Sequence, residues 1–283
     1  MLWGTVGTAQ ALSPYAGSPV GLAAARIGVT GLIFAVVAAV AHGRALPAVL
    51  LRRGSRRYLL LGAAAMAAYQ ASFLTAMQQT GVAVGALLSA GSAPLFAGLL
   101  AALAGRRPTR GWLASTAVAV AGLTLLVVPG GDGHLRAVGV AAGLIAGAAF
   151  ATYTWCSRCL LDAGVPRTPL LAGLFLIGAA LVAPFDLAGV TGWLADPGGA
   201  TVLGYLVVVA TVLPYTIWIR GMATTAPAAA ATLTLAEPLT ATVAGVLVLD
   251  EPLTVTVTAG AALLGAGLVL TATTGRTVSR RRP

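Results

Sequence analysis

Apolar runs of about membrane-spanning length follow one another along almost the whole chain. A helix needs about 20 consecutive apolar residues to cross the hydrocarbon core of a bilayer. Ten runs are found, and their expected boundaries are 1–12, 19–41, 58–79, 82–104, 109–128, 137–161, 169–190, 200–223, 227–249 and 253–274. The chain is therefore predicted to be an all-α integral membrane protein with ten transmembrane helices. The first run is too short to cross alone, so we expect it to continue through Ser13 and Pro14 or to be preceded by residues before Met1.

The composition places the chain in a bilayer rather than on a nucleic acid. Hydrophobic residues make up 58% of the chain, charged residues 8%, and the mean hydropathy is +0.93. A soluble domain is roughly half apolar and a quarter charged. The net charge of +10 comes from arginines that lie mostly in the gaps between apolar runs, where they set membrane orientation instead of contacting phosphates. No cofactor or metal site is expected.

The loop charges predict the orientation, because short cytoplasmic loops carry the excess of arginine. With a cytoplasmic N-terminus, 15 of the 17 arginines are internal; Arg136 is external and Arg26 lies within a span. Five of the seven acidic residues are then external, and Asp162 is internal. Both termini are expected on the cytoplasmic side of the inner membrane. The internal arginines are Arg44, Arg52, Arg53, Arg56, Arg57, Arg106, Arg107, Arg110, Arg158, Arg167, Arg220, Arg276, Arg280, Arg281 and Arg282.

Two pairs of prolines indicate an internal duplication. Pro94 and Pro108 lie 14 residues apart, and so do Pro238 and Pro252, with 144 residues between the pairs. Five helices in each half make the second half enter the membrane from the opposite side. The expected domains are a first five-helix repeat at 1–129, an inverted second repeat at 137–274 and a basic cytoplasmic tail at 275–283. Inverted repeats with a site at the midplane are typical of secondary transporters.

These residues carry a family resemblance. The chain resembles the EamA-type transporters of the drug/metabolite transporter superfamily through Trp3-Gly4, Arg26, the helix with Ala93-Pro94, and Ala236-Glu237-Pro238 followed by 250–254, which reads Asp-Glu-Pro-Leu-Thr. The resemblance implies a ten-helix export carrier. The first-half loop with Arg106-Arg107-Pro108 departs from the acidic residue usual in the family, so this loop is assigned no transport role.

Glu237 is the candidate proton-coupling residue. It is the acidic residue inside the run 227–249, about midway along it. Ionisable residues within spans are rare and are usually functional. Burial disfavours a charged carboxyl group, so Glu237 could bind a proton in one state and release it in another. Pro238 is expected to kink the helix and to leave the carbonyl group one turn earlier unpaired, and Pro94 is its kinking counterpart in the first half.

A set of aromatic, amide and charged side chains is expected to line a site for a semi-polar solute. Most of these residues lie deep within their spans, away from the interfaces where aromatic residues serve as anchors. Packing between helices is the alternative role for each. The candidate substrate-binding residues are Trp3, Arg26, Tyr69, Gln70, Phe73, Tyr153, Tyr215, Trp218 and Glu237.

Other motifs exclude several activities. The Cys-x-x-Cys sequence at Cys156 and Cys159 follows no strand, so a thioredoxin-like redox site is disfavoured. His42 and His134 lie in opposite loops, so no catalytic histidine is expected at membrane depth and the protein is not expected to be an enzyme. Glycines four residues apart at 139, 143 and 147 allow helices to pack closely. One chain is expected to suffice, with a dimer as the alternative.

The predicted function is secondary transport by alternating access. The solute is a small metabolite, amino acid or amphiphilic drug exported across the cytoplasmic membrane, with or without proton coupling. The main alternative is an exchanger of two metabolites that needs no proton. A membrane-embedded enzyme and a non-transporting scaffold are the remaining alternatives, and the acidic and basic residues within spans argue against a scaffold.

The predicted orientation places Arg52 and Arg106 in the cytoplasm and Asp132 and Glu251 outside. Cysteines introduced at 106 and 251, in a chain whose Cys156 and Cys159 are replaced by serine, should react with impermeant thiol reagents from opposite sides of the membrane. Labelling of both from one side would contradict the inverted arrangement.

Overall fold

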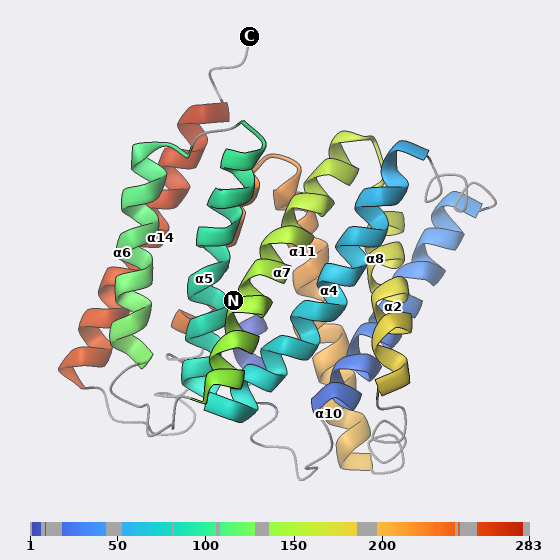
Figure 1. Cartoon of the computed structure of the whole chain (residues 1–283). Helices are drawn as coiled ribbons and strands as arrows, with labels where there is room; N and C mark the ends of the chain where they lie inside the picture. Colours follow the sequence, from blue (N-terminus) through green and yellow to red (C-terminus); the bar gives the residue numbers. More distant parts are fainter. Residues whose placement is uncertain are drawn as a thin grey trace. The chain divides into compact units, whose positions relative to one another are not determined.

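The computed structural model describes residues 2–6, 9, 19–43, 53–80, 82–105, 108–127, 136–185, 197–240, 243 and 254–279 (Figure 1). These residues form helices joined by turns, without a strand among them, so the prediction of an all-α chain is confirmed. The helices are η1 Leu2–Thr5, α2 Pro19–His42, α4 Arg53–Thr80, α5 Val82–Leu103, α6 Arg110–Val127, α7 Ala137–Asp162, α8 Arg167–Val182, η4 Ala183–Phe185, α10 Pro197–Val207, η5 Val208–Val212, α11 Leu213–Met222, α12 Pro227–Leu233 and α14 Val255–Ser279.

Five helical segments of the described chain are long and apolar enough to cross a membrane: Gly21–His42, Gly54–Met77, Gly85–Leu103, Ala137–Asp162 and Pro197–Met222. Each coincides with a predicted run. The shorter apolar helices Arg167–Val182 and Val255–Thr271 coincide with two more.

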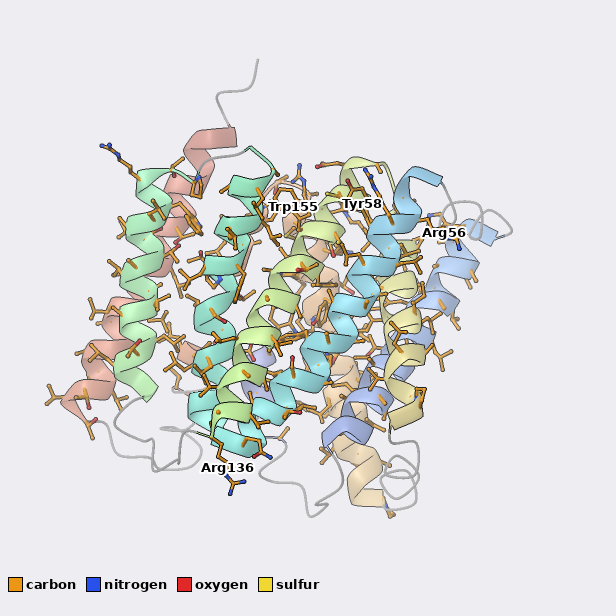
Figure 2. All side chains as sticks on the ribbon, viewed as in Figure 1. Arg56, Tyr58, Arg136 and Trp155 are labelled. Carbon is orange, nitrogen blue, oxygen red and sulfur yellow. The ribbon has the colours of Figure 1, made fainter. Side chains whose placement is uncertain are left out.

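Helix α4 begins five residues before the predicted run, at Arg53, and carries polar residues on its first turns. Arg57 donates a hydrogen bond to the Tyr58 hydroxyl group at 3.0 Å, and its guanidinium carbon lies 4.7 Å from the centre of the Tyr58 ring. Figure 2 shows Arg56 and Tyr58 at this end of the helix. Arginine and tyrosine are favoured at a membrane interface, which explains why the helix can extend past its apolar run.

The run 200–223 is not one regular helix. A π-helical turn, η5, separates α10 from α11, and the Leu213 amide donates to the carbonyl of Val208, five residues earlier. Pro214 follows directly within α11. A proline lacks the amide hydrogen and clashes with the carbonyl four residues before it, so the wider turn relieves a conflict that a regular helix could not.

The chain divides into two compact units. One contains Met1–Thr8, Ser72–Ala151 and Thr224–Pro283, and the other contains Ala9–Ala71 and Thr152–Ala223. Each unit therefore takes helices from both halves of the sequence. Helices α4 and α7 each contribute residues to both units.

In the first unit, α6 and α14 pack against each other in opposite directions (Figure 1). Ser115 lies opposite Thr271, which donates a hydrogen bond to it at 2.9 Å. A Cβ atom at Gly267 would lie 2.5 Å from the amide nitrogen of Ala119, and one at Gly122 would clash with the backbone of Leu264. The order of these pairs makes the two helices antiparallel.

In the second unit, α2 and α8 form a similar antiparallel pair (Figure 1). A Cβ atom at Gly31 would lie 2.9 Å from the amide nitrogen of Leu176. One turn further along α2, the rings of Phe34 and Phe175 meet edge to face at 5.8 Å. Small residues let the backbones approach, and the aromatic pair fills the space beyond them.

Helix starts in the two halves of the sequence correspond at a nearly constant offset. The starts of α4 and α10, at Arg53 and Pro197, are 144 residues apart. The starts of α5 and α12 and those of α6 and α14 are each 145 residues apart. Helices related in this way also pack together as α2 with α8, α5 with α12 and α6 with α14.

The glycines of α7 confirm the prediction of close packing within the chain. A Cβ atom at Gly139 would lie 2.5 Å from Thr80 Cγ2, and one at Gly143 would lie 2.5 Å from Leu88 Cβ. A Cβ atom at Gly147 would clash with the Ser92 hydroxyl group. All of these residues belong to the first unit.

The charges that determine the predicted orientation lie largely outside the described residues. They include Arg52, Arg106, Asp132 and Glu251. The orientation therefore stays a prediction. At the other end of the chain, α14 continues to Ser279, five residues past the predicted end of the last run.

The contact between α6 and α14 predicts opposite responses at two glycines of α14. Gly267→Ala should lower the free energy of unfolding by about 1–3 kcal/mol, because the added methyl group overpacks the contact with Ala119. Gly265→Ala is the matched control, since no atom lies within 4 Å of its Cβ position. Thermal unfolding of the purified protein measures both. Equal melting temperatures for the two variants would contradict this packing.

Candidate functional site

Arg26 and Gln70 form a polar contact between α2 and α4. The Arg26 Nη2 atom donates a hydrogen bond to Gln70 Oε1 at 2.8 Å. Gln70 is fully buried and Arg26 is partly buried. Two further nitrogens of the pair, Arg26 Nε and Gln70 Nε2, are buried without a hydrogen-bond partner in the described part of the chain. The sequence predicted both residues as candidates, and the fold brings them together.

The depth of this pair follows from the helix register. Arg26 lies seven residues after the start of α2, which is about 10 Å along the helix axis. Its neighbours Leu22 to Ala25 and Ile27 are buried, so the guanidinium group is held among apolar residues. A charged group at such depth is costly unless polar atoms replace its water.

Three of the predicted aromatic residues also come together, in the second unit. The rings of Tyr153 and Trp218 stack at 5.3 Å with an interplanar angle of 19°, and Tyr215 meets both edge to face at 6.1 and 6.3 Å. Phe175 of α8 joins them, 4.9 Å from Tyr215. The sequence did not predict Phe175, because nothing in its apolar run distinguishes it from a lipid-facing residue.

Burial separates the roles of these rings. Tyr153, Phe175 and Tyr215 are at most 3% exposed, so each is covered by its neighbours. Trp218 is partly exposed. In this conformation the three buried rings hold Trp218 in position, and Trp218 is the ring of the cluster that offers surface to a solute.

Glu237 lies just after an interruption in a helix. Helix α12 ends at Leu233, residues 234–235 form a turn, and 236–240 are helical again. The prediction of one continuous helix over 227–249 is therefore wrong at this point, and the predicted residues 241–242 and 244–249 lie outside the described chain. Pro238 cannot donate to the carbonyl of Thr234, so the Glu237 amide donates to it instead, at 2.9 Å. The expected unpaired carbonyl is thus paired.

The segment around Glu237 is anchored by leucines. Leu235 is fully buried against Ala119, Leu123 and Leu264, and Leu239 packs on the same cluster. In a helix, residues two positions apart point in nearly opposite directions, so Glu237 faces away from this apolar cluster. Glu237 itself is partly buried.

The other predicted residues are distributed between the units. Trp3 lies in η1 and Phe73 in α4, both in the first unit, while Tyr69 precedes Gln70 in the second. All three are partly buried. Pro94 is buried within α5, which runs without interruption from Val82 to Leu103, in contrast to the break before Pro238.

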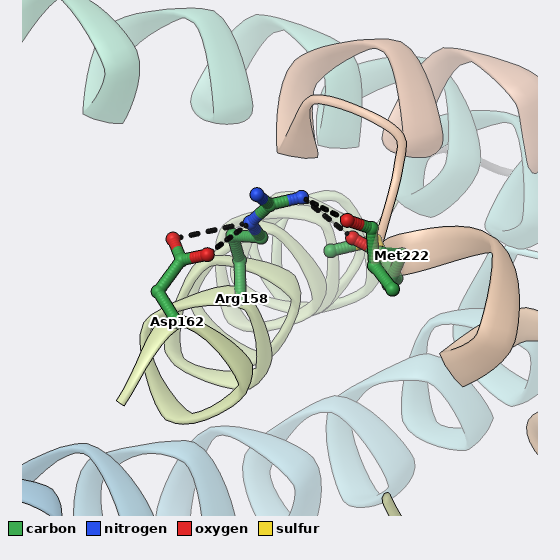
Figure 3. A network of polar contacts seen from close by, with 4 residues as sticks. Arg158, Asp162 and Met222 are labelled. Carbon is green, nitrogen blue, oxygen red and sulfur yellow. Dashed lines mark hydrogen bonds and ion pairs between the residues drawn. The ribbon is translucent and has the colours of Figure 1, made fainter. Parts of the chain in front are cut away.

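A polar network that the sequence did not predict ties α7 to the end of α11 (Figure 3). Arg158 Nε donates to both carboxylate oxygens of Asp162 at 3.0 and 3.1 Å. Its Nη1 atom donates to the carbonyls of Met222 and Ala223 at 2.8 and 3.1 Å. Helix ends leave such carbonyls without intrahelical partners, so Arg158 caps α11. The four-residue spacing of Arg158 and Asp162 was the signal available in the sequence.

The turn after α7 places this network beside a cavity of about 560 Å³. Gly164, with a φ angle of 77°, ends the helix, and the Gly164 and Val165 amides donate to the carbonyls of Leu161 and Leu160. This is the Schellman pattern of a helix C-terminus. Asp162, Arg167, Thr216 and Arg220 line the cavity with apolar residues of α7, α8 and α11.

The cysteines of α7 are free thiols, with Cys156 buried and Cys159 partly buried. A Cβ atom at Gly62 would lie 3.0 Å from Cys156 Cβ. Cys156 therefore acts as a small packing residue where α4 and α7 approach each other.

Comparisons with known proteins agree on the family. The model of the EamA-like transporter family matches residues 1–128 and again 137–273. The chain is 35% identical over 269 residues to the "Uncharacterized transporter YwfM" of Bacillus subtilis (strain 168), covering 95% of this chain and 89% of that protein. A crystal structure of a protein 21% identical matches with a TM-score of 0.77 over 98% of this chain and 94% of the other, which shows a shared fold.

The Arg158 network predicts that its carbonyl contacts matter more than its ion pair. Arg158→Gln should lower the free energy of unfolding by about 2 kcal/mol, because charged donors to buried carbonyls are lost. Asp162→Asn should cost about 0.5 kcal/mol or less, because the paired side chains are 25% and 52% exposed. Chemical or thermal unfolding of the purified variants gives the comparison. A larger loss for Asp162→Asn would reverse the assignment.

Proposed function

The chain belongs to the EamA-like transporter family, and on this premise we propose that it is a secondary active exporter that moves a small organic solute by alternating access. Membership of the family makes it a multi-pass membrane transporter. The proposal adds the mechanism, the energy source and the class of solute. Export across the cytoplasmic membrane is proposed from the family resemblance.

Alternating access is supported by the pairing of helices from the two sequence halves. Helices α2 and α8, and likewise α6 and α14, are related by the repeat offset and run antiparallel. Two copies of a fold with opposite orientations would produce such pairs. We propose the repeats 1–129 and 137–274, with the basic tail 275–283 outside them, as the two halves that move relative to the solute.

The observation that carries the proposal is the interrupted helix with an acidic side chain. Glu237 follows the turn at 234–235, and Pro238 follows Glu237. Broken helices at the site are a recurrent feature of secondary transporters, because the freed polar groups can bind ions and substrates. The leucine anchors at 235 and 239 fix this segment, so the carboxyl group is held in place on its opposite face.

Glu237 is the proposed site of proton coupling. Its carboxyl group can alternate between a neutral state, favoured by burial, and a charged state, favoured by contact with water or a cation. Alternating access supplies this change of environment. A proton bound on one side of the membrane would then be released on the other, and the proton gradient would drive the solute.

Glu237→Gln should abolish pH-driven accumulation while solute exchange partly survives, because glutamine preserves the shape of the protonated acid and cannot lose the proton. The measurement uses proteoliposomes with an imposed pH gradient and solutes found by a resistance screen in an efflux-deficient host. Asp162→Asn, which removes the exposed carboxylate of α7, is the matched control and should accumulate solute normally.

Normal pH-driven accumulation by Glu237→Gln would remove the proton-carrier role. A wild-type protein that needs a counter-solute and no pH gradient would instead be a metabolite exchanger.

A further inference from the structure

We propose that Arg26 and Gln70 bind the carboxylate group of the transported solute. This inference rests on the proposed function, since it assigns the solute's charged group to a specific pair of residues. The pair lies between α2 and α4 of the second unit, with one hydrogen bond of 2.8 Å between the two side chains.

The first argument is the balance of charge. The guanidinium group is always ionised in a protein, and within a span it normally pairs with an acid or lines a polar cavity. In the described part of the chain the ion pair found joins Arg158 to Asp162, at the end of α7. Arg26 instead contacts a neutral amide oxygen. One positive charge of the pair is therefore left without an anion among the described residues.

The second argument is the type of the atoms that lack partners. An arginine has donors and no acceptor, so the amide of Gln70 must turn its oxygen toward Arg26 and its nitrogen away. The two buried nitrogens without partners, Arg26 Nε and Gln70 Nε2, are then both donors. A ligand that satisfies them must bring acceptors. A carboxylate brings two oxygens and the negative charge that the pair lacks.

A purely structural role explains the pair less well. An interhelical hydrogen bond would need only two neutral side chains, and a buried charge without a counter-ion lowers stability. Gln70 is fully buried, so water does not satisfy its amide from the surface. Groups that cost stability in the empty protein and gain partners with a ligand are expected at binding sites.

A second arginine–glutamine pair in the chain shows what the environment changes. Arg136 Nη1 donates to Gln79 Oε1 at 3.3 Å, and this contact is exposed. Figure 2 shows Arg136 projecting away from the start of α7. The same two side-chain types therefore occur once where water can complete their hydrogen bonds and once where it cannot.

The single guanidinium group limits the class of solute. One positive charge balances a monoanionic carboxylate, such as that of an amino acid or a short organic acid. A phosphate ester, with more negative charge, would require further cationic groups. The inferred solutes are therefore monocarboxylates and zwitterions, and a solute that lacks the carboxylate should not bind.

The test uses purified wild-type protein in lipid nanodiscs and a panel of amino acids and short monocarboxylic acids, each paired with its carboxamide. Thermal unfolding reports binding without requiring transport. At least one acid should raise the melting temperature of the wild type while its amide does not. Arg26→Gln should weaken that binding about tenfold or more, and Gln70→Leu should weaken it by less. Arg136→Gln is the matched control and should bind as the wild type does.

The substitutions also make a prediction for the empty protein. Arg26→Gln should leave the melting temperature of the empty protein unchanged or raise it, because it removes an uncompensated charge. A drop of several degrees would assign Arg26 to folding and overturn the inference. It is equally overturned if no acid stabilises the wild type, or if acid and amide act alike. Proton coupling through Glu237 is measured separately, so binding of an acid without pH-driven transport would contradict only the proposed energy source.

Discussion

Polar groups inside a bilayer have no water to bind, so each must find its partner within the protein. This requirement accounts for much of what the helices do beyond their apolar surfaces. Thr116 and Thr232 share a hydrogen bond at 3.1 Å, and Thr271 reaches both Ser115 and its own helix. Where the helix breaks before Glu237, the backbone re-pairs within the turn. Arg158 does the same for the end of α11 from a neighbouring helix. The pair of Arg26 and Gln70 departs from this rule, which is why it invites a ligand.

Helix packing depends on a second constraint. Lipid tails are as apolar as leucine, so helices gain little by hiding apolar side chains from lipid and associate through close contact. Glycine at 122 and 267 brings α6 and α14 together, and glycine at 31 does so for α2 and α8. The abundance of glycine and alanine in the sequence therefore reflects the need for short distances between helices.

Helix positions were predictable because membrane thickness fixes the length of an apolar run. The irregular points were not, because they depend on which backbone atoms lose partners. Pro214 and Pro238 are both visible in the sequence, yet one produces a π turn and the other an interruption. Arg26 and Gln70 stood out as polar residues in apolar runs, but their contact requires the pairing of α2 with α4. Phe175 and the role of Arg158 in capping α11 depended wholly on tertiary contacts.

The π turn at 208–212 sets the two sequence halves apart. A π turn takes up one more residue than an α turn, and each residue in a helix advances the side chain by about 100°. Everything after it, including Tyr215 and Trp218, is therefore swung around the axis relative to the matching part of α4, which has no such turn. Two related scaffolds thus carry unlike linings. A chamber built from them would be handed, and it could tell one end of an unsymmetrical molecule from the other.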